Sequence, residues 1–204
     1  MPSEPPSDSR KTFPIACIVL AAGAGSRYGE PKVGATLPDG TRFVDAISRT
    51  AHEAGARPVV VVAPPGHRAP PDTRAIINPD AQSQQIASIR LGVANLANTS
   101  VRGALVWPVD HPLVRRDTLL SMIETARSTG AKFVVPTFEG RRGHPGYFAR
   151  ETWNELMTAV GAGAREVLHS HSHEVRELPV ADPGVLANID TQADLDRALA
   201  QADR

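Results

Sequence analysis

Continuous runs of apolar residues alternate along this chain with segments in which apolar residues recur every three or four positions. Runs of strand length lie at 15–22 (IACIVLAA), 57–63 (RPVVVVA), 103–109 (GALVWPV) and 132–135. Their length and β-branched content predict strands that are buried on both faces of a sheet. A short strand is predicted at 74–78, and the alternation over 175–180 is typical of an edge strand.

The segments between these strands carry the spacing of amphipathic helices. Helices are predicted from about 43 to 54, where Gly55 is a good C-terminal stop, and from Ser83 to about 96. Further helices are expected around 119–126, 150–160, 164–169 and 191–202, the last with Thr191 as its N-cap, whereas 140–146 reads as irregular. Strands that alternate with helices predict an α/β fold with a mostly parallel sheet, in which ligands bind beyond the carboxyl ends of the strands.

The composition narrows the class of protein. A chain of 204 residues with 41% hydrophobic content suits one globular domain, which we expect at 13–204, after a polar and disordered tail at 1–12. The 22 basic and 22 acidic residues balance, so no net field attracts nucleic acid or an anionic membrane. The one cysteine, Cys17, lies in the first apolar run, and no run approaches the roughly 18 apolar residues that span a bilayer. These features fit a protein of the reducing cytoplasm.

A glycine-rich loop follows the first strand, with the sequence LAAGAGSRYGEPK. Gly23 and Gly25 let backbone N–H groups approach an anion, and Arg27 and Lys32 supply positive charge. The spacing fits neither a Walker loop nor a dinucleotide fingerprint, because Tyr28 stands where each motif needs a glycine. An ordinary strand-to-helix turn would explain the glycines alone, whereas the two cations favour a phosphate-binding loop.

Two carboxylates are expected at the same edge of the sheet as this loop. Asp110 follows the third long run and is followed by His-Pro, and Asp190 lies just before the closing helix. Each of them alone reads as a turn or a helix cap. As a pair they can hold Mg²⁺, and with a phosphate loop they predict phosphoryl or nucleotidyl transfer.

A second motif is the run His169-Ser-His171-Ser-His173. Its alternation would present imidazoles to a metal ion such as zinc. Because no cysteine pair or second histidine motif accompanies the run, a solvated helix end is favoured over a zinc site.

Five segments of the chain, taken together, resemble the MobA-like NTP transferases. They are LAAGAGSRYGEPK, NPDAQSQQIASIRLGV, VDHPLV, RRGHPGYF with the later GARE, and DPGVLANIDTQADL, and they run from about residue 15 to the C-terminus. The combination of LAAG, GHP, GAR and the IDT ending is most similar to the molybdenum cofactor cytidylyltransferases. The resemblance implies a Rossmann-like three-layer sandwich that transfers CMP from CTP to the phosphate of molybdopterin, releasing pyrophosphate with the help of Mg²⁺.

The same resemblance implies a role for each matching position. The nucleotide-binding residues would be Leu20, Ala21, Ala22, Gly23, Gly25, Ser26, Arg27, Lys32, Gln85 and Ser88. Arg27, Lys32 and Asp110 would be catalytic, and Asp110 and Asp190 would bind the metal. His144, Pro145 and Arg165 would contact the acceptor, and a transient contact with a molybdoenzyme or its chaperone is expected.

The chain departs from the family pattern at a few positions, of which Gln84 matters most because a glycine usually stands there, near the nucleoside. Asn188 stands where an aspartate is common before the IDT ending. One alternative is therefore a nucleotidyltransferase for another NTP or another phosphorylated acceptor, such as a sugar phosphate. A second alternative is a non-catalytic module that binds or delivers a nucleotide or cofactor, although pure binding does not need both carboxylates and both loop cations.

Overall fold

The computed structural model describes residues 13–22, 34–80, 85–160 and 163–202. The tail expected at 1–12 and the segment 23–33, which contains most of the predicted phosphate loop, lie outside the described residues. The same holds for Ser83 and Gln84.

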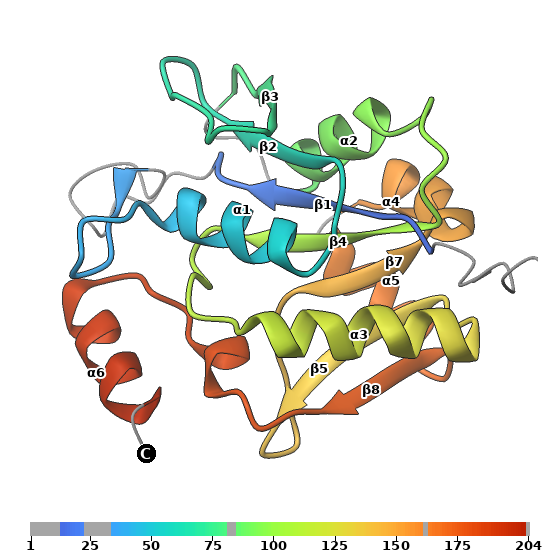
Figure 1. Ribbon diagram of the computed structural model, residues 1–204. Helices are drawn as coiled ribbons and strands as arrows, with labels where there is room; N and C mark the ends of the chain where they lie inside the picture. The colour runs from blue at the N-terminus through green and yellow to red at the C-terminus, as the bar shows by residue number, and fades with distance from the viewer. Residues whose placement is uncertain (1–12, 23–33, 81–84, 161–162, 203–204) are drawn as a thin grey trace, which may run out of the picture.

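A mixed sheet forms the middle layer of the molecule, and in the described residues it has eight strands (Figure 1). Their spatial order is β3 (Arg74–Ile77), β2 (Val59–Ala63), β1 (Ile15–Leu20), β4 (Gly103–Pro108), β7 (Gly146–Ala149), β5 (Phe133–Phe138) and β6 (Arg141–Arg142), with β8 (Val175–Pro179) paired to β5. The strands β3, β2, β1 and β4 pair in parallel, as does β8 with β5. The predicted α/β class, with its buried strands and the edge strand β8, is confirmed.

The prediction of an irregular segment at 140–146 is wrong in part, because β6 and the start of β7 lie there. Strand β7 runs antiparallel between β4 and β5, so its hydrogen bonds come from segments distant in the sequence. Four residues carry too little periodicity to predict a strand. Close packing with β4 supports it, since a Cβ atom on Gly103 would lie 2.5 Å from the hydroxyl oxygen of Tyr147.

Helices cover both faces of the sheet and complete the three layers. One face packs against α1 (Phe43–Glu53), α3 (Arg116–Thr129) and α6 (Gln192–Ala202), and the other against α2 (Gln85–Asn95), α4 (Trp153–Thr158) and α5 (Ala164–Ser170). Two short 3₁₀ helices, η2 (Arg150–Thr152) and η3 (Pro183–Leu186), add to these helices. Figure 1 shows α1 and α3 in front of the sheet and α2, α4 and α5 behind it. None of the described helices is long and apolar enough to cross a membrane.

The helix ends follow the signals that the sequence carries. Gly55, with a φ of 86°, ends α1 in a Schellman motif, in which Ala56 N–H donates to the carbonyl of Ala51 at 3.0 Å. At the start of α6, Asp194 N–H donates to Oγ1 of Thr191 at 3.2 Å, so the predicted N-cap is confirmed.

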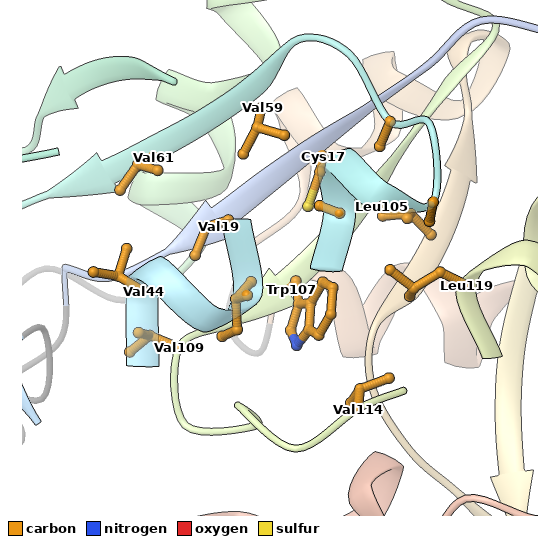
Figure 2. Packing of buried hydrophobic residues seen from close by; sticks show 14 of the residues in the cluster. Cys17, Val19, Val44, Val59, Val61, Leu105, Trp107, Val109, Val114 and Leu119 are labelled. Carbon is orange, nitrogen blue, oxygen red and sulfur yellow. The ribbon is translucent and has the colours of Figure 1, made fainter. Parts of the chain in front are cut away.

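Trp107 of β4 connects the core on the α1 side of the sheet to the turn that follows β4. Its side chain is fully buried, and Figure 2 shows the ring near Val114 and Leu119. The indole Nε1–H donates to the backbone carbonyl of His111 at 3.0 Å. A buried aromatic residue thus restrains the turn that follows β4. Cys17 lies in the same cluster, where burial raises the pKa of its thiol, in agreement with a packing role.

Candidate active site

A cleft of about 650 Å³ lies at the carboxyl ends of β1 and β4, on the side of the sheet that α2 and α5 cover. Its walls come from segments far apart in the sequence. They are lined by Leu20, Gln85, Val106, Pro108, Asp110, His111, Val135, Arg141, Arg142, Gly143, His144, Gly146, Phe148, Ala164, Arg165, Leu168, His169, Val185, Leu186 and Asn188. The cleft therefore brings together predicted residues from the nucleotide, metal and acceptor sets.

Asp110 lies at the end of β4 and is held from its own turn. Its Oδ1 accepts a hydrogen bond from Nδ1 of His111 at 2.8 Å, and a quarter of its side chain is exposed to the cleft. His111 is itself fixed, because its carbonyl accepts the bond from Trp107. The carboxylate is thus oriented before any ligand arrives, as a metal-binding or charge-stabilising group should be.

His144 packs against His111 on the acceptor side of this carboxylate. The two ring centroids are 4.5 Å apart, with an angle of 60° between the planes. Burial, together with the positive charge that His111 and Arg165 place nearby, lowers the pKa of His144 to about 4. At neutral pH this imidazole is uncharged, so positive charge on the acceptor side comes from other residues.

The segment before α6 lies beside Asp110. Ile189 N–H donates to the backbone carbonyl of Asp110 at 2.8 Å, which places Asp190 one residue from this contact. Oδ2 of Asp190 accepts a hydrogen bond from Nδ2 of Asn188 at 2.9 Å. Asn188 lines the cleft, whereas Asp190 is not among the lining residues. The fold brings the two predicted metal-binding segments together, as their common sheet edge suggested.

Asp182 anchors this segment to the rest of the protein. Its buried carboxylate accepts hydrogen bonds from Arg115 N–H at 2.8 Å, the Thr118 hydroxyl at 2.7 Å and Gly184 N–H at 2.9 Å. Gly184 must be a glycine here, because a Cβ atom would lie 2.3 Å from the carbonyl oxygen of Leu113. Nothing in the sequence distinguishes Asp182, since an aspartate before Pro-Gly reads as an ordinary turn residue.

The predicted nucleotide-binding residues fall into three groups. Leu20 and Gln85 line the cleft, whereas Ala21 and Ala22 are buried beside it at the end of β1. Gly23, Gly25, Ser26, Arg27 and Lys32 lie outside the described residues. Ser88 is buried in α2, and its hydroxyl oxygen accepts a hydrogen bond from Nδ2 of Asn78 at 3.0 Å.

The predicted acceptor residues are partly gathered at the other end of the cleft. His144 and Arg165 line it, whereas Pro145 is buried and not among the lining residues. Sequence reasoning missed the lining residues Arg141, Arg142, His111 and His169. The two arginines belong to the RRGHPGYF motif. Their position at the cleft depends on the pairing of β6 with β5, which the sequence does not reveal.

The three histidines of the HSHSH run have different surroundings. Within the described ranges no group of three or more His, Cys, Asp or Glu side chains could hold a metal ion. His169 lines the cleft, His171 contacts Glu155 and Glu174, and 78% of the His173 side chain is exposed.

Glu174 and His171 belong to a small ion-pair network that joins α4, β8 and the residue before β5. Hydrogen bonds from Lys132 and His171 lower the pKa of Glu174 to about 2, and the bond with Glu174 raises the pKa of His171. The contribution of Glu174 to stability is present above its ordinary pKa of 4.5 and is lost as the pH falls towards 2. The contribution of His171 is complete below 6.5 and is lost as the pH rises through its raised pKa.

We therefore expect Glu174→Gln to lower the melting temperature most between about pH 4.5 and 6.5. A drop of about 2 °C is expected there, because the network is largely solvated, and the difference from wild type should vanish near pH 2. Thermal melts across this range check it, with Glu166→Gln on the exposed side of α5 as the control. A difference that stays constant with pH would contradict the assignment.

The side chains near the cleft can bind a divalent cation only if the phosphates of a nucleotide supply further oxygen ligands. Asp110 and Asn188 line the cleft, and Asp190 lies two residues after Asn188, where it bonds to the Asn188 amide. Among the described residues no group of three or more His, Cys, Asp or Glu side chains could hold a metal ion without further ligands. Mg²⁺ and Mn²⁺ are commonly held by one or two carboxylates together with substrate phosphates and water. The residues present therefore fit a metal ion that binds with a triphosphate.

The fold is a three-layer α/β sandwich, and a carboxylate at the end of β4 lies in a cleft at the carboxyl ends of the strands. This combination is typical of nucleotidyltransferases. The family model of the MobA-like NTP transferase domain matches residues 17–175, and the chain belongs to this family. The chain is a nucleotidyltransferase related to enzymes of molybdenum cofactor biosynthesis, and the alternative of a non-catalytic module is set aside.

Individual relatives agree with this placement. A protein of Mycolicibacterium paratuberculosis named "Probable molybdenum cofactor guanylyltransferase" is 30% identical over 193 residues, covering 92% of this chain and 96% of the relative. The crystal structure of Rv0371c from Mycobacterium tuberculosis H37Rv has a TM-score of 0.78 at 26% identity and covers 93% and 99% of the two chains. A structure of the same protein in complex with manganese has a TM-score of 0.74 at 26% identity, with 92% and 98% covered.

Proposed function

We propose that this chain transfers a nucleoside monophosphate from an NTP to the phosphate of a molybdopterin-type cofactor. The observation that carries the proposal is that Leu20, where the predicted phosphate loop starts, and Asp110 line the same cleft as His144 and Arg165. The family placement and the name of the relative from Mycolicibacterium paratuberculosis support the acceptor.

In the proposed reaction an oxygen of the acceptor phosphate attacks the α-phosphorus of the NTP. A new phosphorus–oxygen bond forms, the bond from the α-phosphorus to the bridging oxygen breaks, and pyrophosphate leaves with that electron pair. Arg27 and Lys32 would neutralise charge on the phosphates, and Asp110 with Asp190 would hold the metal ion. A divalent cation, when bound, supplies charge neutralisation and orients the triphosphate. The manganese complex of the relative from Mycobacterium tuberculosis supports such a cation.

For the nucleotide we infer GTP as the first candidate. The relative from Mycolicibacterium paratuberculosis carries a guanylyl group in its name, which supports GTP over the CTP that the sequence motifs favoured. CTP remains the second candidate, because LAAG, GHP, GAR and IDT occur together in this chain. The position of Gln84, where the family usually has glycine, lies outside the described residues.

A thermal-shift panel with ATP, GTP, CTP and UTP, each with and without Mg²⁺, tests the choice of nucleotide. We expect GTP with Mg²⁺ to raise the melting temperature by about 5–10 °C at a concentration about 100-fold above its Kd, because only the folded state gains binding energy. A larger shift with CTP would move the assignment to cytidylyl transfer. Equal shifts for all four nucleotides, independent of Mg²⁺, would contradict a specific nucleotide site.

The acceptor is tested by pyrophosphate release with the preferred nucleotide. Molybdopterin should support turnover, whereas sugar phosphates serve as the comparison set. Turnover with a sugar phosphate and none with molybdopterin would replace the proposed acceptor while leaving nucleotidyl transfer intact.

A further inference from the structure

His169 lies on the acceptor side of the cleft, one helical turn after Arg165. The two residues are four positions apart in α5, a spacing that places side chains on the same face of a helix. Both line the cleft, together with Ala164 and Leu168 from the same helix. His171 instead bonds to glutamates outside the cleft, so neighbouring histidines of one run have different surroundings.

The side chains of Arg165 and His169 are available to a ligand. In the part of the chain that the structure describes, neither has a hydrogen bond or an ion pair. Arg165 nevertheless lies close enough to His144 to lower the pKa of that imidazole. Contacts run from Asp110 through His111 to His144, and Arg165 and His169 line the same cleft.

The rest of the cleft favours an anion that carries a ring system. Asp110 is the one acidic side chain among its described lining residues, against three arginines. Arg142, from β6, donates through Nε to Glu177 at 2.8 Å, which leaves its two terminal nitrogens for other acceptors. Phe148, Val106 and Leu168 give the cleft an apolar wall, suited to the flat part of a ligand.

We propose that His169 is an acceptor-binding residue that, with Arg165, holds the phosphate of the acceptor and directs it towards Asp110. This inference rests on the proposed function and adds a residue to its acceptor site. Arg165 supplies a permanent charge, and His169 donates a hydrogen bond from its ring. Because both project from one face of α5, they hold the phosphate at two points and limit its rotation.

Steady-state kinetics of pyrophosphate release by His169→Ala, whose side chain has no hydrogen-bond donor, test the inference. The KM for molybdopterin should rise about tenfold, since one hydrogen bond to a charged group is lost, while kcat and the KM for the nucleotide change by less than about twofold. His173→Ala is the matched control, because His173 belongs to the same run but is exposed outside the cleft. Wild-type KM values for both variants, or a lower kcat with an unchanged acceptor KM, would overturn the inference.

A binding measurement separates this inference from the proposed function. Protein with ¹⁵N-labelled histidine is titrated with inorganic phosphate and, separately, with molybdopterin, and the imidazole resonances are followed by NMR. The His169 signals should shift with both ligands and the His173 signals with neither, and Arg165→Gln should weaken the shifts. Shifts at His169 without turnover of molybdopterin would remove the proposed acceptor but keep the phosphate site. Turnover of molybdopterin without any change at His169 would remove the site but keep the function.

Discussion

Replacing Asp110 by asparagine is expected to lower the rate of pyrophosphate release by about 10³-fold while leaving the protein folded. Asparagine keeps an oxygen for the hydrogen bond from Nδ1 of His111, so the turn after β4 should survive. The variant loses the negative charge that would bind the divalent cation. Without the cation, the negative charge that develops on the phosphates in the transition state is less well neutralised. The rate is measured at saturating nucleotide and metal, and the fold by thermal melting.

The matched control for this variant is Asp117→Asn, which removes a carboxylate of which 90% is exposed, on α3 and outside the cleft. It should retain wild-type turnover. If Asp110→Asn turned over within tenfold of wild type, Asp110 would not be the metal-binding and charge-stabilising residue, and the proposed mechanism would be wrong.

Replacing Asp182 by alanine is expected to cause the largest loss of stability, about 3–5 kcal/mol in the free energy of unfolding. The change removes a buried acceptor of three hydrogen bonds and leaves the amides of Arg115 and Gly184 and the hydroxyl of Thr118 without it. Each buried donor without a partner costs about 1–3 kcal/mol. Denaturant unfolding, compared at equal m-values, measures the difference.

Asp182→Asn is the graded control, because it keeps the shape and one acceptor oxygen. Oδ2 accepts from Arg115 and Thr118, whereas Oδ1 accepts from Gly184 and lies 4.0 Å from Nε of Arg115. An amide with its oxygen at the Oδ2 position therefore loses the bond from Gly184 and the ion pair with Arg115. A loss of about 1–2 kcal/mol is expected. Equal losses for the two variants would show that packing of the side chain, and not its hydrogen bonds, stabilises the segment.

Comparing Asp110→Asn with Asp182→Asn also distinguishes the carboxylate proposed to bind the metal ion from the carboxylate that holds the neighbouring segment in place. Asp182 joins the start of α3 to the segment that carries Asn188 and Asp190, and Ile189 bonds to the backbone of Asp110. Folded Asp182→Asn protein should therefore bind metal and nucleotide less tightly, with turnover at saturation close to wild type.

The amino-acid sequence determined the elements whose signals are local. The continuous β-branched runs became buried strands, since a strand covered on both faces needs no polar alternation. The recurring apolar positions became the buried faces of α1 and α2, and Gly55 and Thr191 ended and began helices through their own backbone and side-chain bonds. The strand order alone placed Asp110 at a strand end, whereas the hydrogen bond from Ile189 N–H to the carbonyl of Asp110 brings the segment of Asp190 beside it.

Only the tertiary structure decided which distant segments meet. Strand β7 exists because β4 and β5 supply its hydrogen bonds, and its four residues carried no sufficient signal of their own. Asp182 reads as a turn residue until the donors of α3 and η3 surround it. His169 and His171 are two residues apart, yet one lines the cleft and the other bonds to glutamates, because the end of α5 turns successive side chains towards different neighbours.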